Sequence, residues 1–329
     1  MEKIYGMIDL HLHLDGSLSV DSVRKLAALQ NMEIPQEEDA LRRMLQVREG
    51  CRDLNEYLEK FAFPCSLMQT KEGIAGAVQH LEAELAEAGM LYAELRFAPQ
   101  QHTEKGLTQR EVVAAAISGM GRSGLRSNLI LCCMRGTDNR EKNLETIHVA
   151  KEFLHKGVAA ADLAGAEALF PTEGFGELFA LARELGVPYT IHAGEAAGPE
   201  SIGWALEFGT KRVGHGVRAL EDEAMVKRLA AEGITLELCP TSNLHTSMFD
   251  SYEEYPLRKL MEAGVRVTVN TDNMAVSGTT VSAELKHLQE ALQLTEQELR
   301  LLAETAAEAS FADAETKEWM KTEIAKRFA

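Results

Sequence analysis

Residues 212–238 read RVGHGVRALEDEAMVKRLAAEGITLEL, and this stretch contains the repeating unit that predicts the fold. A short apolar run, Arg212–His215, is followed by an amphipathic segment, Glu221–Glu232, and then by a second apolar run, Ile234–Leu238. Gly233 stands just before the second run, where the left-handed end of a helix would turn back into a strand. This order is typical of a strand, a crossover helix and a parallel strand.

The same unit recurs along the chain. Eight apolar runs predict strands: Met7–His13, Leu91–Phe97, Leu129–Met134, Val158–Asp162, Pro188–His192, Arg212–His215, Ile234–Leu238 and Arg266–Asn270. Amphipathic segments such as Gly73–Ala88 and Arg110–Ser123 lie between them. The runs are nearly all apolar rather than alternating, as in a parallel sheet covered on both faces. Eight repeats predict an α/β fold of the (β/α)8 TIM-barrel type. The alternative is an open doubly wound sheet, but no GxGxxG or Walker-type loop follows the first strand.

The chain has 329 residues, more than the roughly 250 of a bare barrel. The surplus falls in a helical insertion at residues 17–88, after the first strand, and in a tail from Thr295. That tail begins with a capping-box pattern, Thr295 and Glu298, and is predicted to run helical toward Phe328. No Pro/Gly/Ser-rich linker divides the chain, so we predict one domain over residues 1–329.

Charge and composition narrow the class of protein. The chain has 34 basic and 51 acidic residues, a formal net charge of −17, which argues against nucleic-acid binding and against docking on anionic lipid. No apolar run approaches the roughly 20 residues of a membrane span, and the N-terminus does not resemble a secretory signal, so we expect a cytoplasmic protein. The five cysteines lack CxxC spacing, and no chemistry is predicted for them: Cys51, Cys65, Cys132, Cys133 and Cys239.

Polar residues gather at the carboxyl ends of the predicted strands, where the active sites of barrels lie. His11 and His13 are two residues apart on the first strand, so their side chains share one face. His192 ends the fifth strand, and Asp272 follows the eighth. Three imidazoles and one carboxylate suit Zn²⁺ and leave a coordination position open for water.

Two more residues at these strand ends are candidates for proton transfer. Glu195 lies three residues after His192, where partial burial would raise its pKa and allow it to act as a general acid. His215 is flanked by glycines and is placed to orient or deprotonate a water molecule. Each alone also fits a plainer interpretation, a helix-start carboxylate and a packed strand histidine. The remaining histidines are interpreted as ordinary surface or hydrogen-bonded residues: His80, His102, His148, His155, His245 and His287.

Seven stretches together resemble the adenosine deaminase family. They are DLHLHLDGSL (9–18), AELRFAP (93–99), DLAG (162–165), IHAGEAAGPESI (191–202), RVGHGV (212–217), LCPTSN (238–243) and VNTD (269–272). They occur in family order over nearly the whole chain. The PCxxC signature of the nucleic-acid-editing zinc deaminases is absent.

The resemblance implies that each chain binds one Zn²⁺ through four ligands, His11, His13, His192 and Asp272. The ion would activate a water that attacks C6 of a purine. The resemblance implies that Glu195 protonates N1 and that His215 orients the attacking water and assists its deprotonation, with Asp272 beside it. It also implies that the backbone N–H of Gly165 faces N3 and that Asp15 binds ribose hydroxyls.

The remaining predicted substrate contacts come from the insertion and from the end of the last strand. Tyr57, Leu58 and Phe61 match the family's apolar flap over the substrate, although helix packing explains such a stripe equally well. The family often has two consecutive aspartates where this chain has Asp272 and Asn273. An asparagine amide can donate a hydrogen bond to purine N7 at any pH, so this contact is expected to persist.

The expected substrates are adenosine and 2′-deoxyadenosine, because a carboxylate at Asp15 near the 5′-hydroxyl should repel a phosphate. The alternatives are a deaminase of adenine or of a 5′-modified adenosine and, from another class, a non-catalytic nucleoside-binding protein. A different metal-dependent hydrolase with a bridging lysine on the fourth strand fits less well, because that strand ends in Asp162 and has only Lys156 before it. The sequence predicts no oligomeric state.

Overall fold

The computed structural model describes residues 7–48, 51, 57 and 59–329. Its strands match the eight predicted ones: β1 Ile8–His13, β2 Tyr92–Phe97, β3 Arg126–Met134, β4 Val158–Ala164, β5 Ile191–Ala193, β6 Arg212–His215, β7 Thr235–Leu238 and β8 Arg266–Val269. They form two parallel four-stranded sheets, β1-β2-β3-β4 and β5-β6-β7-β8. Single parallel bridges, Ala161 to Tyr189 and Leu12 to Asp272, join the two sheets at both edges. The strands therefore close into the predicted barrel.

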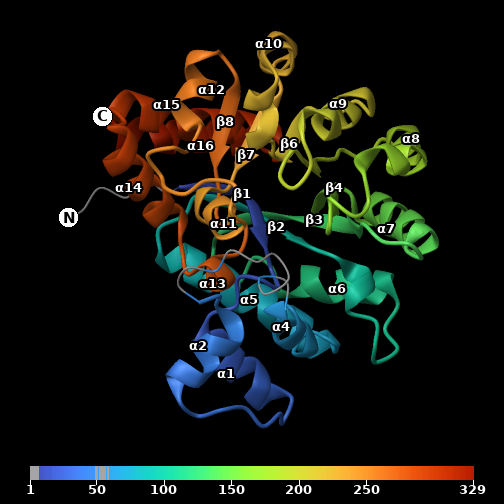
Figure 1. Ribbon diagram of the computed structural model, residues 1–329. Helices are drawn as coiled ribbons and strands as arrows, with labels where there is room; N and C mark the ends of the chain where they lie inside the picture. Colours follow the sequence, from blue (N-terminus) through green and yellow to red (C-terminus); the bar gives the residue numbers. More distant parts are fainter. Residues whose placement is uncertain (1–6, 49–50, 52–56, 58) are drawn as a thin grey trace.

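Helices surround the strands (Figure 1). The described helices of the insertion are α1 Val20–Leu29, α2 Glu38–Leu45, α4 Ala62–Ser66 and α5 Lys71–Glu87. Those that follow β2 to β6 are α6 Gln109–Gly119, α7 Arg140–Phe153, α8 Gly176–Leu185, α9 Pro199–Glu207 and α10 Glu223–Glu232. After β7 come α11 Pro240–His245 and α12 Leu257–Glu262, and after β8 come α13 Met274–Ser277, α14 Val281–Leu292, α15 Glu296–Ala309 and α16 Ala314–Arg327.

Two predicted helices end earlier than expected. The segment predicted as Arg110–Ser123 stops at Gly119, because Gly121 and Gly124 take positive φ angles of 76° and 81° that a helix cannot accommodate. The tail begins with the predicted capping box at Thr295 but is broken at Ser310, which is extended. Asp313 then caps α16 as a separate helix.

The barrel interior is not the apolar filling that the strand pattern indicates. Arg96 and Arg212 both bind the carboxylate of Glu237, at 2.8 Å and 2.7 Å, and all three side chains are buried. Arg96 also reaches Asp162 at 3.1 Å, and Arg212 reaches Glu94 at 2.6 Å. Buried charges are costly unless they are paired and hydrogen-bonded, and here each is paired across the barrel. This ion-pair network lies directly below the polar strand ends.

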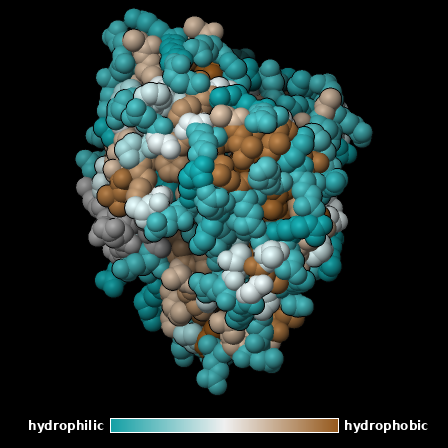
Figure 2. Space-filling view, turned by 90° about the vertical axis from the view of Figure 1, so that its right-hand side faces the viewer, coloured by the Kyte–Doolittle hydropathy of each residue, from teal (hydrophilic) through white to brown (hydrophobic). Residues whose placement is uncertain are grey.

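Hydrophilic side chains dominate one face of the molecule, although patches of apolar side chains interrupt it (Figure 2). Within the described ranges, no helix combines the length and the apolar character needed to cross a bilayer.

Candidate metal centre and active site

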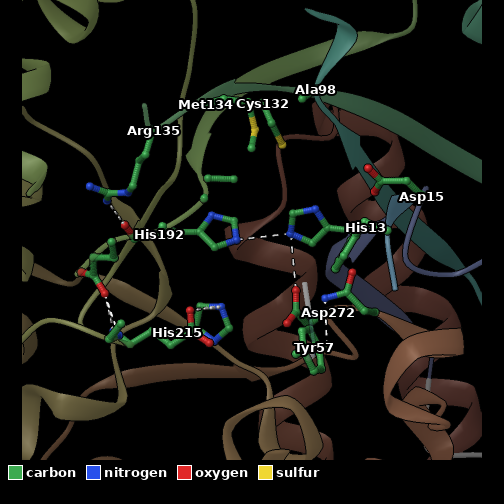
Figure 3. Close-up of a pocket in the computed structure, with 18 of the residues that line it drawn as sticks. His13, Asp15, Tyr57, Ala98, Cys132, Met134, Arg135, His192, His215 and Asp272 are labelled. Atoms are coloured by element: carbon green, nitrogen blue, oxygen red, sulfur yellow. Dashed lines mark hydrogen bonds and ion pairs between the residues drawn. The ribbon is translucent and has the colours of Figure 1, made fainter. Parts of the chain in front are cut away.

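A cavity of about 340 Å³ opens at the carboxyl ends of the strands (Figure 3). Its lining includes six of the residues singled out in the sequence: His13, Asp15, His192, Glu195, His215 and Asp272. This volume is near the lower end of the range for small-molecule sites. The structure therefore brings these residues from four strand ends, those of β1, β5, β6 and β8, to one pocket, as expected for a barrel.

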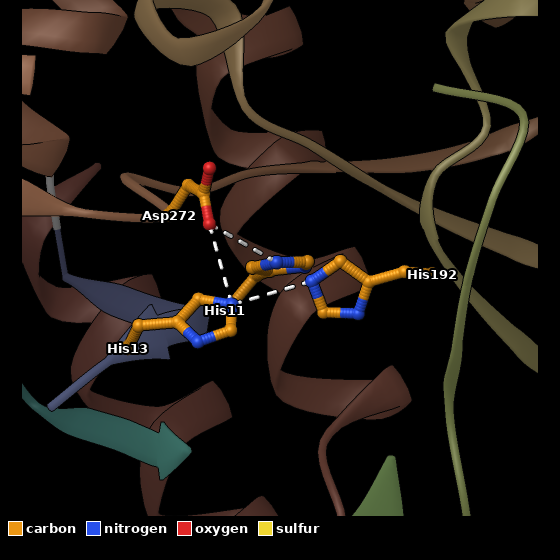
Figure 4. A group of neighbouring side chains, drawn as sticks. All are labelled: His11, His13, His192 and Asp272. Atoms are coloured by element: carbon orange, nitrogen blue, oxygen red, sulfur yellow. Dashed lines mark hydrogen bonds and ion pairs between the residues drawn. The ribbon is translucent and has the colours of Figure 1, made fainter. Parts of the chain in front are cut away.

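Four of the predicted residues form a cluster with the spacing of a metal site (Figure 4). The Nε2 atoms of His13 and His192 are 3.2 Å apart, and the Oδ1 atom of Asp272 lies 3.4 Å from Nε2 of His13. Nε2 of His11 is 3.5 Å from the same Oδ1 atom, and it is buried without a hydrogen-bond partner of good geometry. Nitrogen ligands about 2.05 Å from a tetrahedral zinc ion stand about 3.3 Å from one another. The donor set and its spacing therefore fit zinc.

Acidic residues behind the cluster orient two of its imidazoles. His11 donates from Nδ1 to Glu237 at 2.8 Å, and His192 donates from Nδ1 to Asp162 at 2.9 Å. These bonds leave both Nε2 atoms facing the centre of the cluster. Burial alone would raise the pKa of Glu237, but the guanidinium groups of Arg212 and Arg96 outweigh it and hold that pKa well below its usual range. The ion-pair network thus keeps Glu237 as an acceptor for His11.

Two of the three imidazoles, those of His11 and His13, are in the protonation state that metal binding requires. For His192, burial is outweighed by the Asp162 carboxylate, which raises the pKa of that ring. Burial lowers the pKa of His11 to about 4 and moves the pKa of His13 well below its ordinary value. Both rings are therefore neutral near pH 7, with a lone pair available on Nε2.

His215 and Glu195 face each other across the pocket. Nε2 of His215 lies 3.6 Å from Oε2 of Glu195, and burial raises the pKa of that carboxyl. The side-chain nitrogen of Asn243 lies 3.1 Å from Nδ1 of His215. Because an amide nitrogen can only donate, Nδ1 must accept, and in the neutral ring the proton lies on Nε2.

The other end of the Asn243 amide contacts a tyrosine. The hydroxyl of Tyr255 donates to Oδ1 of Asn243 at 2.8 Å. The amide oxygen thus faces Tyr255 and the amide nitrogen faces His215. The sequence analysis did not single out Asn243, although it lies within the LCPTSN stretch.

The loop that carries Glu195 is anchored by Glu167, which the sequence analysis missed. The Glu167 carboxylate is buried and accepts hydrogen bonds from the backbone N–H groups of four consecutive residues, at 2.7, 3.1, 2.8 and 2.9 Å: Gly194, Glu195, Ala196 and Ala197. The hydroxyl of Ser201 also donates to it. No sequence pattern signals this role, because the two segments are joined only in the folded chain.

Replacing Glu167 with Gln should lower kcat, because an amide replaces the charged acceptor of these four N–H groups and Glu195 loses its fixed position. A hydrogen bond to a charged group contributes about 1.5–3 kcal/mol. If the transition state loses that stabilisation, kcat falls about tenfold to hundredfold. Steady-state kinetics and zinc content should be measured together, with the exposed Glu173→Gln as the matched control. An unchanged kcat in a folded, zinc-loaded Glu167→Gln variant would refute the anchoring role.

The expected substrate-binding residues also reach the cavity, with one exception. Gly165, Phe61 and Asn273 all line it, and Gly165 has a φ of 104°, which favours glycine. Asn273 donates from Nδ2 to the hydroxyl of Tyr57 at 3.1 Å, which leaves its second amide hydrogen available. Leu58 lies outside the described residues.

Comparison with known proteins places the chain in a family. The family model described as adenosine deaminase matches residues 7–327. The chain belongs to the adenosine deaminase family. It is 47% identical over 334 residues to an adenosine deaminase of Haemophilus ducreyi, covering 98% of this chain and 97% of the relative. It is 38% identical to an adenosine deaminase of Enterococcus faecalis, covering 96% and 95% of the two chains.

Among solved structures, an adenine deaminase from Arthrobacter aurescens superposes with a TM-score of 0.87 at 27% identity, covering 98% of each chain. The similarity extends over the barrel, the insertion and the tail. Adenosine deaminase family members are metal-dependent, and His11, His13, His192 and Asp272 are the candidate metal site of this one.

Proposed function

We propose that the chain catalyses the hydrolytic deamination of adenosine and 2′-deoxyadenosine to inosine and 2′-deoxyinosine, with release of ammonia. The observation that carries this proposal is 47% identity to an adenosine deaminase over 98% of the chain. The alternative of a non-catalytic nucleoside-binding protein is not favoured, because the acidic, imidazole and metal-binding side chains are all retained around one cavity. A single domain over residues 1–329 and a cytoplasmic location stay predictions.

We propose zinc as the resident ion, one per chain, because three imidazoles and a carboxylate at tetrahedral spacing are a typical zinc donor set. Bound there, the ion would lower the pKa of a water molecule and so supply a nucleophile near neutral pH.

Glu195 and His215 would handle the protons around the purine. The raised pKa of Glu195 favours a protonated carboxyl, which can donate to N1 and draw electron density away from C6. Water then adds at C6 and gives up two protons, one to the leaving amino group and one back to the Glu195 carboxylate, as the C6–N bond breaks and ammonia leaves. Since Nδ1 of His215 accepts from Asn243, its Nε2–H is a donor toward the pocket. That hydrogen would orient the attacking water.

The remaining contacts would position the nucleoside. We propose that Asp15 binds ribose hydroxyls, that the N–H of Gly165 faces N3, and that Tyr57, Leu58 and Phe61 cover the base. Asp15 is buried at the cavity wall, where its carboxylate disfavours a 5′-phosphate. Nucleosides are therefore expected to be better substrates than AMP.

Asn273 is expected to bind purine N7 through its free amide hydrogen. The Asn273→Ala variant should lose about 1 kcal/mol or more of transition-state binding, so kcat/KM for adenosine should fall about fivefold or more. Asn128→Ala is the matched control, because Asn128 also donates to a tyrosine hydroxyl, that of Tyr92, near the amino end of β3. Wild-type kcat/KM in the Asn273→Ala variant would contradict the N7 contact.

The substrate assignment is tested by ammonia release from five compounds at equal concentration: adenosine, 2′-deoxyadenosine, adenine, AMP and a 5′-modified adenosine. We expect the two nucleosides to give the highest kcat/KM. Preference for adenine or for the 5′-modified compound would replace adenosine as the substrate and leave the reaction class intact.

A further inference from the structure

His102 does not fit the sequence-based interpretation of an ordinary surface or hydrogen-bonded histidine, and that interpretation is wrong. The residue follows β2 and is completely buried, and neither ring nitrogen makes a hydrogen bond of acceptable geometry. The Met68 carbonyl slightly favours the protonated ring, but burial outweighs it and lowers the pKa of His102 to about 4. The imidazole is therefore neutral, with a lone pair that no described group uses.

The side chains of Asp15 and Cys65 lie beside this ring. One ligand atom from each of Asp15, Cys65 and His102 lies within 4.8 Å of the other two. Asp15 also has a buried oxygen, Oδ1, without a hydrogen-bond partner. Two independent side chains thus present unsatisfied polar atoms at the same place, which is uncommon in a folded protein.

The thiol of Cys65 donates a weak hydrogen bond to Asp15, and the spacing of these two atoms also suits a metal ion. Sγ of Cys65 is 3.7 Å from Oδ2 of Asp15. Sulfur at about 2.3 Å and oxygen at about 2.1 Å from a tetrahedral zinc ion would be about 3.6 Å apart. Burial and the Asp15 carboxylate raise the pKa of the Cys65 thiol, so it is protonated without a cation. A bound cation would displace that proton and ligate the thiolate.

We propose that Asp15, Cys65 and His102 form a second divalent-cation site, distinct from the candidate metal centre and suited to zinc. A sulfur, an imidazole nitrogen and a carboxylate oxygen select zinc-like ions over Mg²⁺ or Ca²⁺, which prefer oxygen ligands. The three residues come from the end of β1, from α4 and from the segment after β2. Asp15 lines the cavity, so a cation can reach the site through it.

Occupation of this site would compete with the nucleoside. Asp15 is the residue proposed to bind ribose, and a carboxylate that ligates a cation is no longer free to accept from ribose hydroxyls. Excess zinc should therefore raise the KM for adenosine. This consequence for activity rests on the proposed function, whereas the existence of the site does not.

The test starts from protein that carries one zinc ion and titrates it with ZnCl2 under equilibrium dialysis. We expect the wild-type chain to take up a second zinc ion. Cys65→Ala and His102→Gln should each weaken the binding of that second ion by at least about tenfold. Cys51→Ala is the matched control, since Cys51 belongs to none of the possible cation clusters, and it should bind like the wild type.

Cadmium absorption and the KM for adenosine provide two further tests of the second site. CdCl2 added to the one-zinc wild-type protein should give a thiolate-to-cadmium absorption band, which Cys65→Ala should lack. Excess zinc should raise the KM for adenosine in the wild type and much less in the two variants.

A wild-type chain that stops at one zinc ion, a missing cadmium band in the wild type, or variants that bind the second ion as tightly as the wild type would overturn the site. Failure of the one-zinc protein to deaminate adenosine would instead overturn the proposed function, and the dialysis result would still decide whether the site exists.

Discussion

Replacing Glu195 with Gln should lower kcat for adenosine by about 10²–10⁴-fold, the usual contribution of a positioned general acid. The amide keeps the shape of the side chain but cannot transfer a proton to N1. Because Glu195 is not among the four clustered ligands, zinc content should stay at one ion per chain, and KM should change little. Steady-state kinetics and metal analysis on the same preparation separate these effects.

The matched control is Glu207→Gln, an exposed residue on α9 that should leave kcat unchanged. A Glu195→Gln variant that keeps more than a tenth of wild-type kcat with full zinc content would contradict proton donation by Glu195. Loss of zinc together with activity would also contradict it, since it would assign Glu195 to the metal centre.

Replacing His13 with Ala should abolish high-affinity zinc binding and with it the activity. His13 contacts both His192 and Asp272 in the cluster, at 3.2 and 3.4 Å, so its removal opens one side of the donor set. A bound ion is expected to supply several kcal/mol of transition-state stabilisation, which corresponds to a loss of about 10³-fold or more in kcat/KM.

Metal analysis after dialysis against metal-free buffer, followed by ammonia-release kinetics, checks this prediction. His148→Ala is the control, because His148 is an exposed histidine on α7. A His13→Ala variant that retains both one zinc ion and wild-type kcat/KM would remove His13 from the ligand set.

The barrel and the metal cluster were predictable from the sequence because both depend on short-range patterns. Apolar runs recurring with amphipathic segments mark parallel strands, and the carboxyl ends of parallel strands in a barrel meet on one face. His11, His192 and Asp272 could therefore be placed together although they are far apart in the chain.

The roles of the residues around the metal cluster and the active-site loop were not predictable, because their partners lie far away in sequence. Glu237 is one acidic residue in an apolar strand, and nothing local shows that Arg96, 141 positions earlier, neutralises it inside the barrel. Glu167 is in a similar position, since its four N–H partners belong to the loop after the next strand. His102 was misinterpreted for the same reason: its burial beside Cys65 depends on how the insertion packs against the segment after β2.

The most direct test of the account is conversion of adenosine to inosine and ammonia by the zinc-loaded chain, repeated after verified metal removal and after zinc is added back. The account predicts equal amounts of inosine and ammonia, loss of activity in the metal-free protein, and recovery with one zinc ion per chain. Full activity without metal, or no ammonia from adenosine with zinc bound, would contradict it.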